Sequence, residues 1–432
     1  MIRTTQYAIA TELAPKDADE AALGVLVKIS GRKRRLIQVM EAILRPLVAG
    51  LEWVRPLPRN TGGKVDKILV MEYWNLGDLV MLTPFLRSLR IQYPEATITL
   101  LTNPKAAPLL EGQGLVDKVF TVRVPWVEPF SRWRKYNPFS LRWLELLRVV
   151  KLLRAQRFDL AFTARADFRE NFIIWLVRVA RRVGYGFGGG GFLLTDTAIP
   201  DLHYPHFSNR WLRLLEHVGK IALVREPSLQ VTSEEEKFAQ QILAEQDLHD
   251  AEFLIGIHPG ARSAVREWGE ENFRTLAQRL QAQFPIKIVW FQDPSRILPR
   301  ADRNQREPLL LPLRQFMAVL SRCGLFICND SGPMHIATAL GVPVVAIFGP
   351  GEQAWIGPLG QENRVVSQPG FWCRPCFDYC LFDQPYCLRT ISVDSVFEAS
   401  VEALNSLLLK TKQGATSNES TFRVAEAKET AC

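Results

Sequence analysis

Apolar and polar positions follow a repeating α/β pattern between residues 67 and 348. Short apolar runs of strand length are separated by longer segments in which apolar residues recur at helical spacing. The pattern predicts strands at 67–73, 96–102, 158–164, 253–258, 286–291, 325–328 and 344–348. It predicts helices at 79–93, 142–155, 208–219, 271–284, 314–323 and 332–340. Because strands and helices alternate in two successive halves, we expect an α/β protein with two doubly wound domains.

Composition shifts divide the chain into four parts. Residues 1–64 form an extension with an acidic, mobile stretch at 11–22, a basic amphipathic helix and a linker. The four parts are this extension, a Rossmann-like domain at 65–222, a second at 223–408, and a disordered tail at 409–432. A glycine-rich loop at 185–192 is expected to be flexible. A dinucleotide-binding loop has a strand before it and a helix after it, and the sequence around 185–192 lacks this context.

The basic cluster GRKRR at 31–35 opens the helix predicted in the extension. Apolar residues follow it at helical spacing, at Leu36, Met40, Ile43, Leu47 and Leu51. Proline 46 lies inside this helix and is expected to kink it. Cationic residues beside an apolar face are typical of a helix that lies on an anionic membrane. A helix docked on the protein's own surface would show the same pattern, so both interpretations remain open.

The overall composition narrows the classes of partner. Among 432 residues, 47% are apolar and 23% charged, which is typical of a globular protein that is not embedded in a membrane. The net charge of +8 favours anionic ligands or an anionic membrane surface. No nucleic-acid-binding motif occurs. The chain has neither a secretory signal nor an apolar run of about eighteen residues, so we expect a cytoplasmic protein with at most peripheral contact with the inner membrane.

The segment 325–350 carries the strongest functional signal. It predicts a strand, a short helix and a second strand, with Asp330, Ser331 and Gly332 at the first turn and His335 one turn further on. That turn lies at the carboxyl edge of a parallel sheet, where α/β folds bind ligands, and the amides of a helix start attract phosphate. A phosphorylated ligand is therefore expected here. His335 is interpreted either as a structural hydrogen-bonding residue or as a ligand contact.

A second candidate site follows the first strand of the first domain. The sequence NLGD at 75–78 predicts a turn in which Gly77 gives a ligand access to the backbone. Asp78 is then placed at the start of the next helix. It is interpreted either as a helix cap or as a general base that accepts a proton from a hydroxyl group.

A third candidate site is the loop at 258–268, which leaves a strand at Gly260. Arg262 and Arg266 lie on this loop, and the planar guanidinium group is well suited to phosphate oxygens. Two arginines at a sheet edge would neutralise a diphosphate, although solvated surface arginines are the alternative. Trp268 is expected to be a packing residue rather than a ligand contact.

These three segments together resemble glycosyltransferase family 9, the ADP-heptose:lipopolysaccharide heptosyltransferase family. The similar motifs are Gly77-Asp78, the HPG loop from 258 through Arg266 and Trp268, and the DSGPMH segment at 330–335 followed by FGP at 348–350. The resemblance extends from about residue 67 to residue 408. It implies a GT-B fold, with two facing Rossmann-like domains and a central cleft. It also implies transfer with inversion at the anomeric carbon and without a metal ion.

The resemblance also implies roles for individual residues. Asp78 matches the base that deprotonates the acceptor. Arg266 takes the place of a basic residue, often lysine, that contacts the diphosphate. The expected donor-binding residues are Arg262, Arg266, Asp293, Asp330, Ser331, Gly332 and His335, with Gly77 and Gly260 as backbone positions. The expected co-substrate is a nucleotide-diphosphate sugar, for which ADP-heptose is the family's best-known example. The expected acceptor is a lipopolysaccharide or another cell-envelope glycan.

Two further questions remain open at the level of sequence. The cysteine cluster at Cys373, Cys376, Cys380 and Cys387 has spacing that could bind zinc, but we expect free thiols, with a redox-sensitive pair as another alternative. The alternatives to a glycosyltransferase are a nucleotide-sugar epimerase or hydrolase of the same fold and a non-catalytic nucleotide-sugar-binding protein. An intact Asp78 argues against the non-catalytic alternative.

Overall fold

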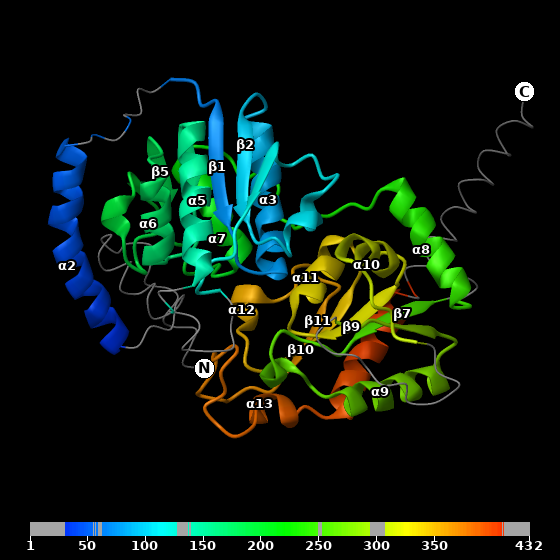
Figure 1. Ribbon diagram of the computed structural model, residues 1–432. Coiled ribbons are helices and arrows are strands. Elements are labelled where there is room, and N and C mark those ends of the chain that lie inside the picture. Colours follow the sequence, from blue (N-terminus) through cyan, green and yellow to red (C-terminus); the bar gives the residue numbers. More distant parts are fainter. Residues whose placement is uncertain are drawn as a thin grey trace, which may run out of the picture. The chain divides into compact units, whose positions relative to one another are not determined.

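The computed structural model describes residues 31–54, 56, 58, 63–127, 137, 140–248, 253–293, 307–407 and 409 (Figure 1). The stretch at 11–22 and the tail beyond residue 409 lie outside the described residues. The chain divides into two compact units. Unit 1 holds the described residues up to Gln230 together with Glu352–Gly357, and unit 2 holds the remainder. Each unit is described by itself.

Unit 1 is built on a six-stranded parallel sheet in the order β3-β2-β1-β4-β5-β6. The strands are β1 (Lys67–Glu72), β2 (Thr97–Thr102), β3 (Lys118–Thr121), β4 (Leu160–Phe162), β5 (Arg181–Gly184) and β6 (Asp196–Thr197). The helices are α2 (Gly31–Val54), α3 (Leu76–Gln92), α5 (Leu141–Gln156), α6 (Phe168–Leu176) and α7 (Phe207–His217), with 3-10 turns at Ala107–Leu110 and Gly191–Leu193. The strand order reverses between β1 and β4. Such a topological switch point is where doubly wound sheets bind ligands.

Unit 2 contains a five-stranded parallel sheet in the order β11-β10-β9-β7-β8. The strands are β7 (Leu254–His258), β8 (Lys287–Trp290), β9 (Leu325–Asn329), β10 (Val344–Phe348) and β11 (Arg364–Ser367). The helices are α8 (Ser233–Glu245), α9 (Glu270–Gln283), α10 (Leu313–Leu320), α11 (Gly332–Ala339) and α13 (Tyr386–Arg389), with a 3-10 turn at Ala264–Arg266 and a further helix at 393–407. The short α12 (Gln353–Ile356) belongs to unit 1. Here the switch point lies between β7 and β9.

The α/β class and the two doubly wound sheets are confirmed. Each predicted strand and helix between 67 and 348 is present, and Gly341 ends α11 with a φ of 78°. The boundary that matters for the site differs: α3 begins at Leu76, so the predicted turn at 75–78 is largely helical, while Asp78 lies in the first turn, at the helix start where it was expected. The reason is local, because Asn75 occupies the N-cap position.

The glycine-rich loop at 185–192 was expected to be flexible, but it is packed. Asn171 of α6 donates from Nδ2 to the carbonyl groups of Tyr185 and Gly189 at 3.1 and 2.9 Å. A side chain at Gly188 would overlap the Ala166 carbonyl oxygen, since a Cβ there would lie 1.6 Å from it. The glycines therefore permit close backbone packing inside unit 1.

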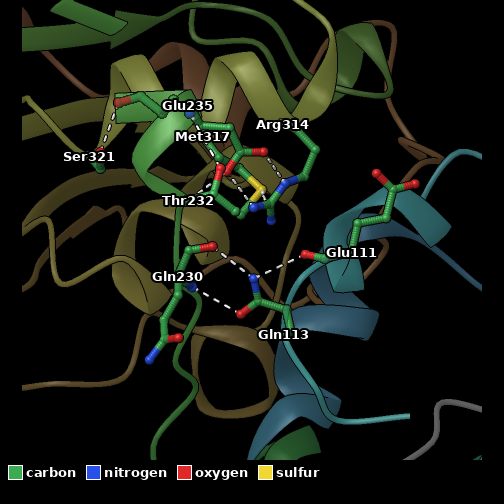
Figure 2. Close-up of polar contacts among 9 residues, drawn as sticks. Glu111, Gln113, Gln230, Thr232, Glu235, Arg314, Met317 and Ser321 are labelled. Carbon is green, nitrogen blue, oxygen red and sulfur yellow. Dashed lines mark hydrogen bonds and ion pairs between the residues drawn. The ribbon is translucent and has the colours of Figure 1, made fainter. Parts of the chain in front are cut away.

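The segment that connects unit 1 to unit 2, near residues 230–232, is hydrogen-bonded within unit 1 at one end and within unit 2 at the other. In unit 1, Gln113 donates from Nε2 to the Gln230 carbonyl at 2.7 Å, and the Gln230 amide donates back to Gln113 Oε1 at 3.0 Å (Figure 2). In unit 2, Thr232 caps α8, and Glu235 of its first turn pairs with Arg314 of α10 at 2.6 Å (Figure 2). Each end of the connecting segment is therefore held by contacts within its own unit.

Candidate functional site

The switch point of the unit 1 sheet gathers four charged side chains. Glu72 ends β1, Asp78 lies in the first turn of α3, Arg165 follows β4, and Glu170 lies on α6. β1 and β4 are neighbouring parallel strands, so the segments that leave them start side by side. We call Glu72, Asp78 and Glu170, together with Arg165, the carboxylate cluster.

Arg165 is the centre of the carboxylate cluster. Its Nη2 forms an ion pair with Asp78 Oδ1, and its Nε lies 3.5 Å from Glu72 Oε2. The guanidinium carbon lies 4.9 Å from the centre of the Trp74 ring and 4.7 Å from that of Phe207. Aromatic faces attract a cation and exclude water, so both rings help to hold Arg165 in place.

Glu72 and Glu170 of the carboxylate cluster are buried, and both have raised pKa values. Glu170 accepts hydrogen bonds from Thr163 Oγ1 at 2.5 Å and from Trp74 Nε1 at 2.7 Å. Burial raises the pKa of Glu170 to about 8 and that of Glu72 to about 7, although Arg165 lowers both. Burial penalises the charged form of a carboxyl group. Both groups therefore keep their proton to a higher pH than an ordinary glutamate does.

Asp78 is fixed by both of its carboxylate oxygens. Its Oδ2 accepts from the Asn75 amide at 3.0 Å and from Asn75 Nδ2 at 3.2 Å, while Oδ1 faces Arg165. One carboxylate oxygen therefore has the capping role that was considered for Asp78. Asp78 occupies the third helical position, and the N-cap residue is Asn75. The same contacts orient the carboxylate, so capping and proton acceptance are compatible.

The switch point of the unit 2 sheet is organised by Asn329, the last residue of β9. Asn329 donates from Nδ2 to the Pro259 carbonyl at 2.7 Å and accepts from the Trp268 amide at 3.1 Å. Trp268 is fully buried, and its Nε1 donates to the Ile391 carbonyl at 2.9 Å. Trp268 is therefore a packing residue, and Asn329 fastens the loop at 258–268 beside β9.

Arginines and aspartates alternate at this edge of unit 2. Arg262 Nη2 forms an ion pair with Asp378 Oδ2, Arg266 Nε lies 3.2 Å from Asp378 Oδ1, and Arg266 Nη1 lies 3.4 Å from Asp330 Oδ2. We call these four residues the arginine–aspartate chain. The alternative of a solvated surface residue is wrong for Arg266, which exposes 11% of its side chain. Arg262 is exposed and still pairs with Asp378.

Asp330 is the most deeply buried member of the arginine–aspartate chain. Burial raises its pKa, and Arg266 opposes this effect. A Cβ at Gly351 would lie 2.1 Å from Asp330 Oδ2, so the turn after β10 passes directly over the carboxylate. Arg374 donates from Nη2 to the Gly351 carbonyl at 3.0 Å and holds that turn.

The remaining predicted donor-binding residues lie at the same sheet edge. Asp293 Oδ2 lies 3.5 Å from His258 Nε2, and a Cβ at Gly260 would lie 2.5 Å from the Asp293 carboxylate. Gly260 thus allows the close approach of these two segments. Burial raises the pKa of Asp293, but the hydrogen bond and the charge of His258 together lower it by more, so the pKa is lowered overall.

The start of α11 carries the other predicted residues. Ser331 occupies the N-cap position, and Gly332 is the first helical residue. Among the residues that the structure describes, the buried Oγ of Ser331 has no hydrogen-bond partner. His335 lies one turn further on and is buried. A buried hydroxyl without a partner is available to a ligand that reaches the helix start.

The cysteine cluster lies in a segment that packs against this site. Cys373 and Cys387 are buried, and burial raises the pKa of the Cys387 thiol. The amides of Cys376 and Phe377 donate to the Pro350 carbonyl at 3.1 and 3.2 Å, which brings Asp378 to the arginines. Within the described ranges, no three His, Cys, Asp or Glu side chains are grouped as a metal site.

The sequence interpretation missed five residues of these sites, namely Glu72, Arg165, Glu170, Asn329 and Asp378. Two left a usable signal. Glu72 is a charged residue inside an otherwise apolar strand, and Arg165 directly follows the strand predicted at 158–164. Asp378 left none, because tertiary packing of the cysteine-containing segment brings it to Arg262 and Arg266.

Comparison with known proteins places this chain among sugar-transferring enzymes. A profile of the family described as glycosyltransferase family 9 (heptosyltransferase) matches residues 146–386, which is more than half of the chain. The lipooligosaccharide heptosyltransferase 2 of Haemophilus ducreyi is 27% identical over 323 residues, covering 69% of this chain and 88% of that protein. The lipopolysaccharide heptosyltransferase 2 of Salmonella typhimurium is 25% identical over 320 residues, covering 69% and 87%.

Solved structures share the fold. A family 9 glycosyl transferase from Veillonella parvula superposes with a TM-score of 0.66 at 24% identity, over 80% of this chain and 98% of that one. The ADP-heptose lipopolysaccharide heptosyltransferase II of Escherichia coli gives a TM-score of 0.60 at 22% identity, over 80% and 99%. At these identities the likeness establishes the fold alone.

Proposed function

Because the chain belongs to glycosyltransferase family 9, we propose that this enzyme transfers heptose from ADP-heptose to a lipopolysaccharide-type acceptor. The names of its relatives, among them the heptosyltransferases of Haemophilus ducreyi and Salmonella typhimurium, support the sugar and the acceptor class. The observation that carries the proposal is the pair of complementary charged sites at the switch points of the two sheets.

We assign the acceptor side of the reaction to the carboxylate cluster. The acceptor hydroxyl attacks the anomeric carbon, and its proton passes to the carboxylate of Asp78. Arg165 and Asn75 keep that carboxylate in one orientation through the contacts described above. Attack on one face of the sugar while the leaving group departs from the other inverts the anomeric configuration.

We assign the leaving group to unit 2. When the bond between the anomeric carbon and the phosphate oxygen breaks, its electron pair stays on the diphosphate. Arg262 and Arg266 would share the added negative charge, together with Ser331 Oγ and the start of α11. Asp378 holds both arginines until the diphosphate competes for them. With two guanidinium groups at this position, we propose that transfer proceeds without an added metal ion.

A lipopolysaccharide-type acceptor would be carried by a lipid surface. We propose the inner face of the cytoplasmic membrane, where a cytoplasmic enzyme would meet a lipid-linked glycan. The donor-binding roles of Asp293, Asp330, Gly332 and His335 are part of the same proposal.

A direct assay tests the proposed function. The purified enzyme is incubated with ADP-heptose and a heptose-deficient lipopolysaccharide core, with and without EDTA. We expect ADP release to require the acceptor, the product to have inverted anomeric configuration by NMR, and EDTA to leave the rate unchanged. Equal ADP release without acceptor would indicate a hydrolase and would contradict the proposal. A requirement for added divalent metal would contradict its metal-free mechanism.

A further inference from the structure

Helix α2 attaches to unit 1 through one face that contains both of its acidic residues. Glu41 accepts a hydrogen bond from the Gly190 amide, and Glu52 accepts one from Trp175 Nε1 at 2.7 Å. Arg45 lies over the Phe192 ring, with 5.4 Å between the guanidinium carbon and the ring centre. The expected docking on the protein's own surface therefore accounts for this face, and α2 continues through Pro46.

The opposite face of α2 is apolar and exposed. Its large apolar side chains are Leu36, Val39, Ile43, Leu47, Leu51 and Val54, each between 56% and 70% exposed. They recur at steps of three and four residues and so form one stripe, about 27 Å long at 1.5 Å per residue. Among the described side chains from 35 to 54, the exposed polar residues are Arg35, Gln38 and Arg45.

This distribution is the reverse of that on an ordinary surface helix, which buries apolar residues and exposes charged ones. Here the carboxylates face the protein and the leucines face outward, beside the indole of Trp53, which is 87% exposed. Contiguous exposed apolar surface marks an interaction site. Tryptophan near such a stripe is typical of a membrane interface.

The basic cluster at 31–35 favours an anionic partner for the apolar stripe. The cluster GRKRR begins α2, where positive charge opposes the helix dipole and so does not stabilise the helix. A second copy of α2 would offer no exposed carboxylate to this cluster, because Glu41 and Glu52 are both engaged in unit 1. A surface of anionic lipid offers an apolar layer and negative charge together.

We propose that α2 is a membrane-docking helix, which lies in the plane of an anionic lipid surface with the Leu36–Val54 stripe inserted. None of the described helices is long and apolar enough to cross a bilayer, and this arrangement does not require one to do so. The inference extends the proposed function, in which the acceptor is carried by a membrane. Its test uses neither donor nor acceptor, so the two proposals fail separately.

The test is co-sedimentation of the full-length protein with vesicles of phosphatidylcholine alone or with added phosphatidylglycerol. We expect binding to the anionic vesicles that weakens at high salt, because screening removes the attraction of the basic cluster. Ile43→Glu combined with Leu47→Glu should lower the vesicle-bound fraction at least about tenfold. Arg35→Glu should lower it about threefold.

A matched control separates insertion from general surface charge. Ile91 and Val119 are exposed apolar residues of unit 1 outside α2, and Ile91→Glu combined with Val119→Glu should leave vesicle binding unchanged. Circular dichroism should show that both double variants keep the wild-type fold. Equal loss of binding in the control, or full binding by the Ile43 and Leu47 variant, would overturn the proposal.

If a second copy of the protein or the chain's own N-terminal segment covered the stripe, the experiments would give different results. A dimer in sedimentation velocity that the Ile43 and Leu47 substitutions dissociate, without any change in vesicle binding, would assign the stripe to a second copy. Vesicle binding that appears only after removal of residues 1–30 would assign it to the chain's own acidic segment. Either result would overturn the lipid assignment.

Discussion

The carboxylate cluster of unit 1 and the arginine–aspartate chain of unit 2 occupy equivalent places in two similar sheets. Each lies at the carboxyl ends of the two strands where the strand order reverses. Their charge balance differs. In unit 1 three carboxyl groups surround Arg165, whereas in unit 2 two arginines alternate with two aspartates.

The difference shows how one fold can serve two chemical tasks. Burial, and after it the neighbouring carboxyl groups, raises the pKa of Glu72 and Glu170, and such a site suits the uptake of a proton. Balanced pairs suit a site where an anionic ligand replaces a carboxylate as the partner of an arginine. The fold supplies the position, and the side chains that follow each strand supply the chemistry.

The largest effect is expected from Asp78→Asn. Asparagine can still accept from the Asn75 amide but cannot take up the acceptor proton, so kcat should fall about a thousandfold. The measurement is the rate of transfer at saturating donor and acceptor. Asp196→Asn is the matched control, since Asp196 also pairs with an arginine of unit 1, at 2.8 Å from Arg181. A rate within about threefold of wild type in Asp78→Asn would remove Asp78 as the base.

A smaller effect on a different parameter is expected from Arg266→Ala. Loss of one charged contact to the diphosphate should raise the KM for the donor about thirtyfold, with a lesser change in kcat. Arg279→Ala removes another ion pair of unit 2, that with Asp394 at 2.6 Å, and should leave the donor KM unchanged. If both variants had the same donor KM as wild type, the leaving-group role of Arg266 would be excluded.

Arg165→Lys should have a smaller effect on kcat, and this effect tests whether Arg165 positions the Asp78 carboxylate. Lysine keeps the charge but cannot pair with Asp78 and Glu72 at once, so we expect kcat to fall about tenfold and its pH profile to shift. The donor KM should stay the same, which steady-state kinetics across pH would show. A rise in the donor KM instead would place Arg165 in donor binding.

The smallest effect is expected in stability. Glu170 has a pKa of about 8 in the folded protein, against an ordinary value of 4.5, so the folded state binds the proton more tightly than the unfolded state. Stability should therefore fall as pH rises from about 5 to 8, by more than about 1 kcal/mol. Glu170→Gln should flatten this dependence in chemical denaturation, and Glu216→Gln should not. An unchanged slope in Glu170→Gln would show that Glu170 is ionised in the folded state.

The sequence predicted the elements between 67 and 348 because their apolar runs are long and punctuated by glycine and proline. It did not predict β3, β5, β6, α6 or α8, which have a short or weakly apolar pattern. Candidate residues next to strand ends, such as Asp78 and Asp330, were recognisable for the same reason. Asp378 was not, because its place depends on how a loop packs.

The extension illustrates the same limit. Periodicity along α2 predicted an amphipathic helix but left its orientation open, because apolar and inward-facing positions are usually the same. The hydrogen bonds of Glu41 and Glu52 show which face of α2 meets the protein.

The division of labour between the two clusters is tested most directly by calorimetric binding of ADP to wild type, Asp78→Asn and Arg266→Ala. The account predicts that Asp78→Asn binds ADP within about threefold of wild type although it does not transfer sugar, and that Arg266→Ala binds ADP at least about tenfold more weakly. Equal loss of ADP affinity in both variants, or wild-type affinity in Arg266→Ala, would contradict it.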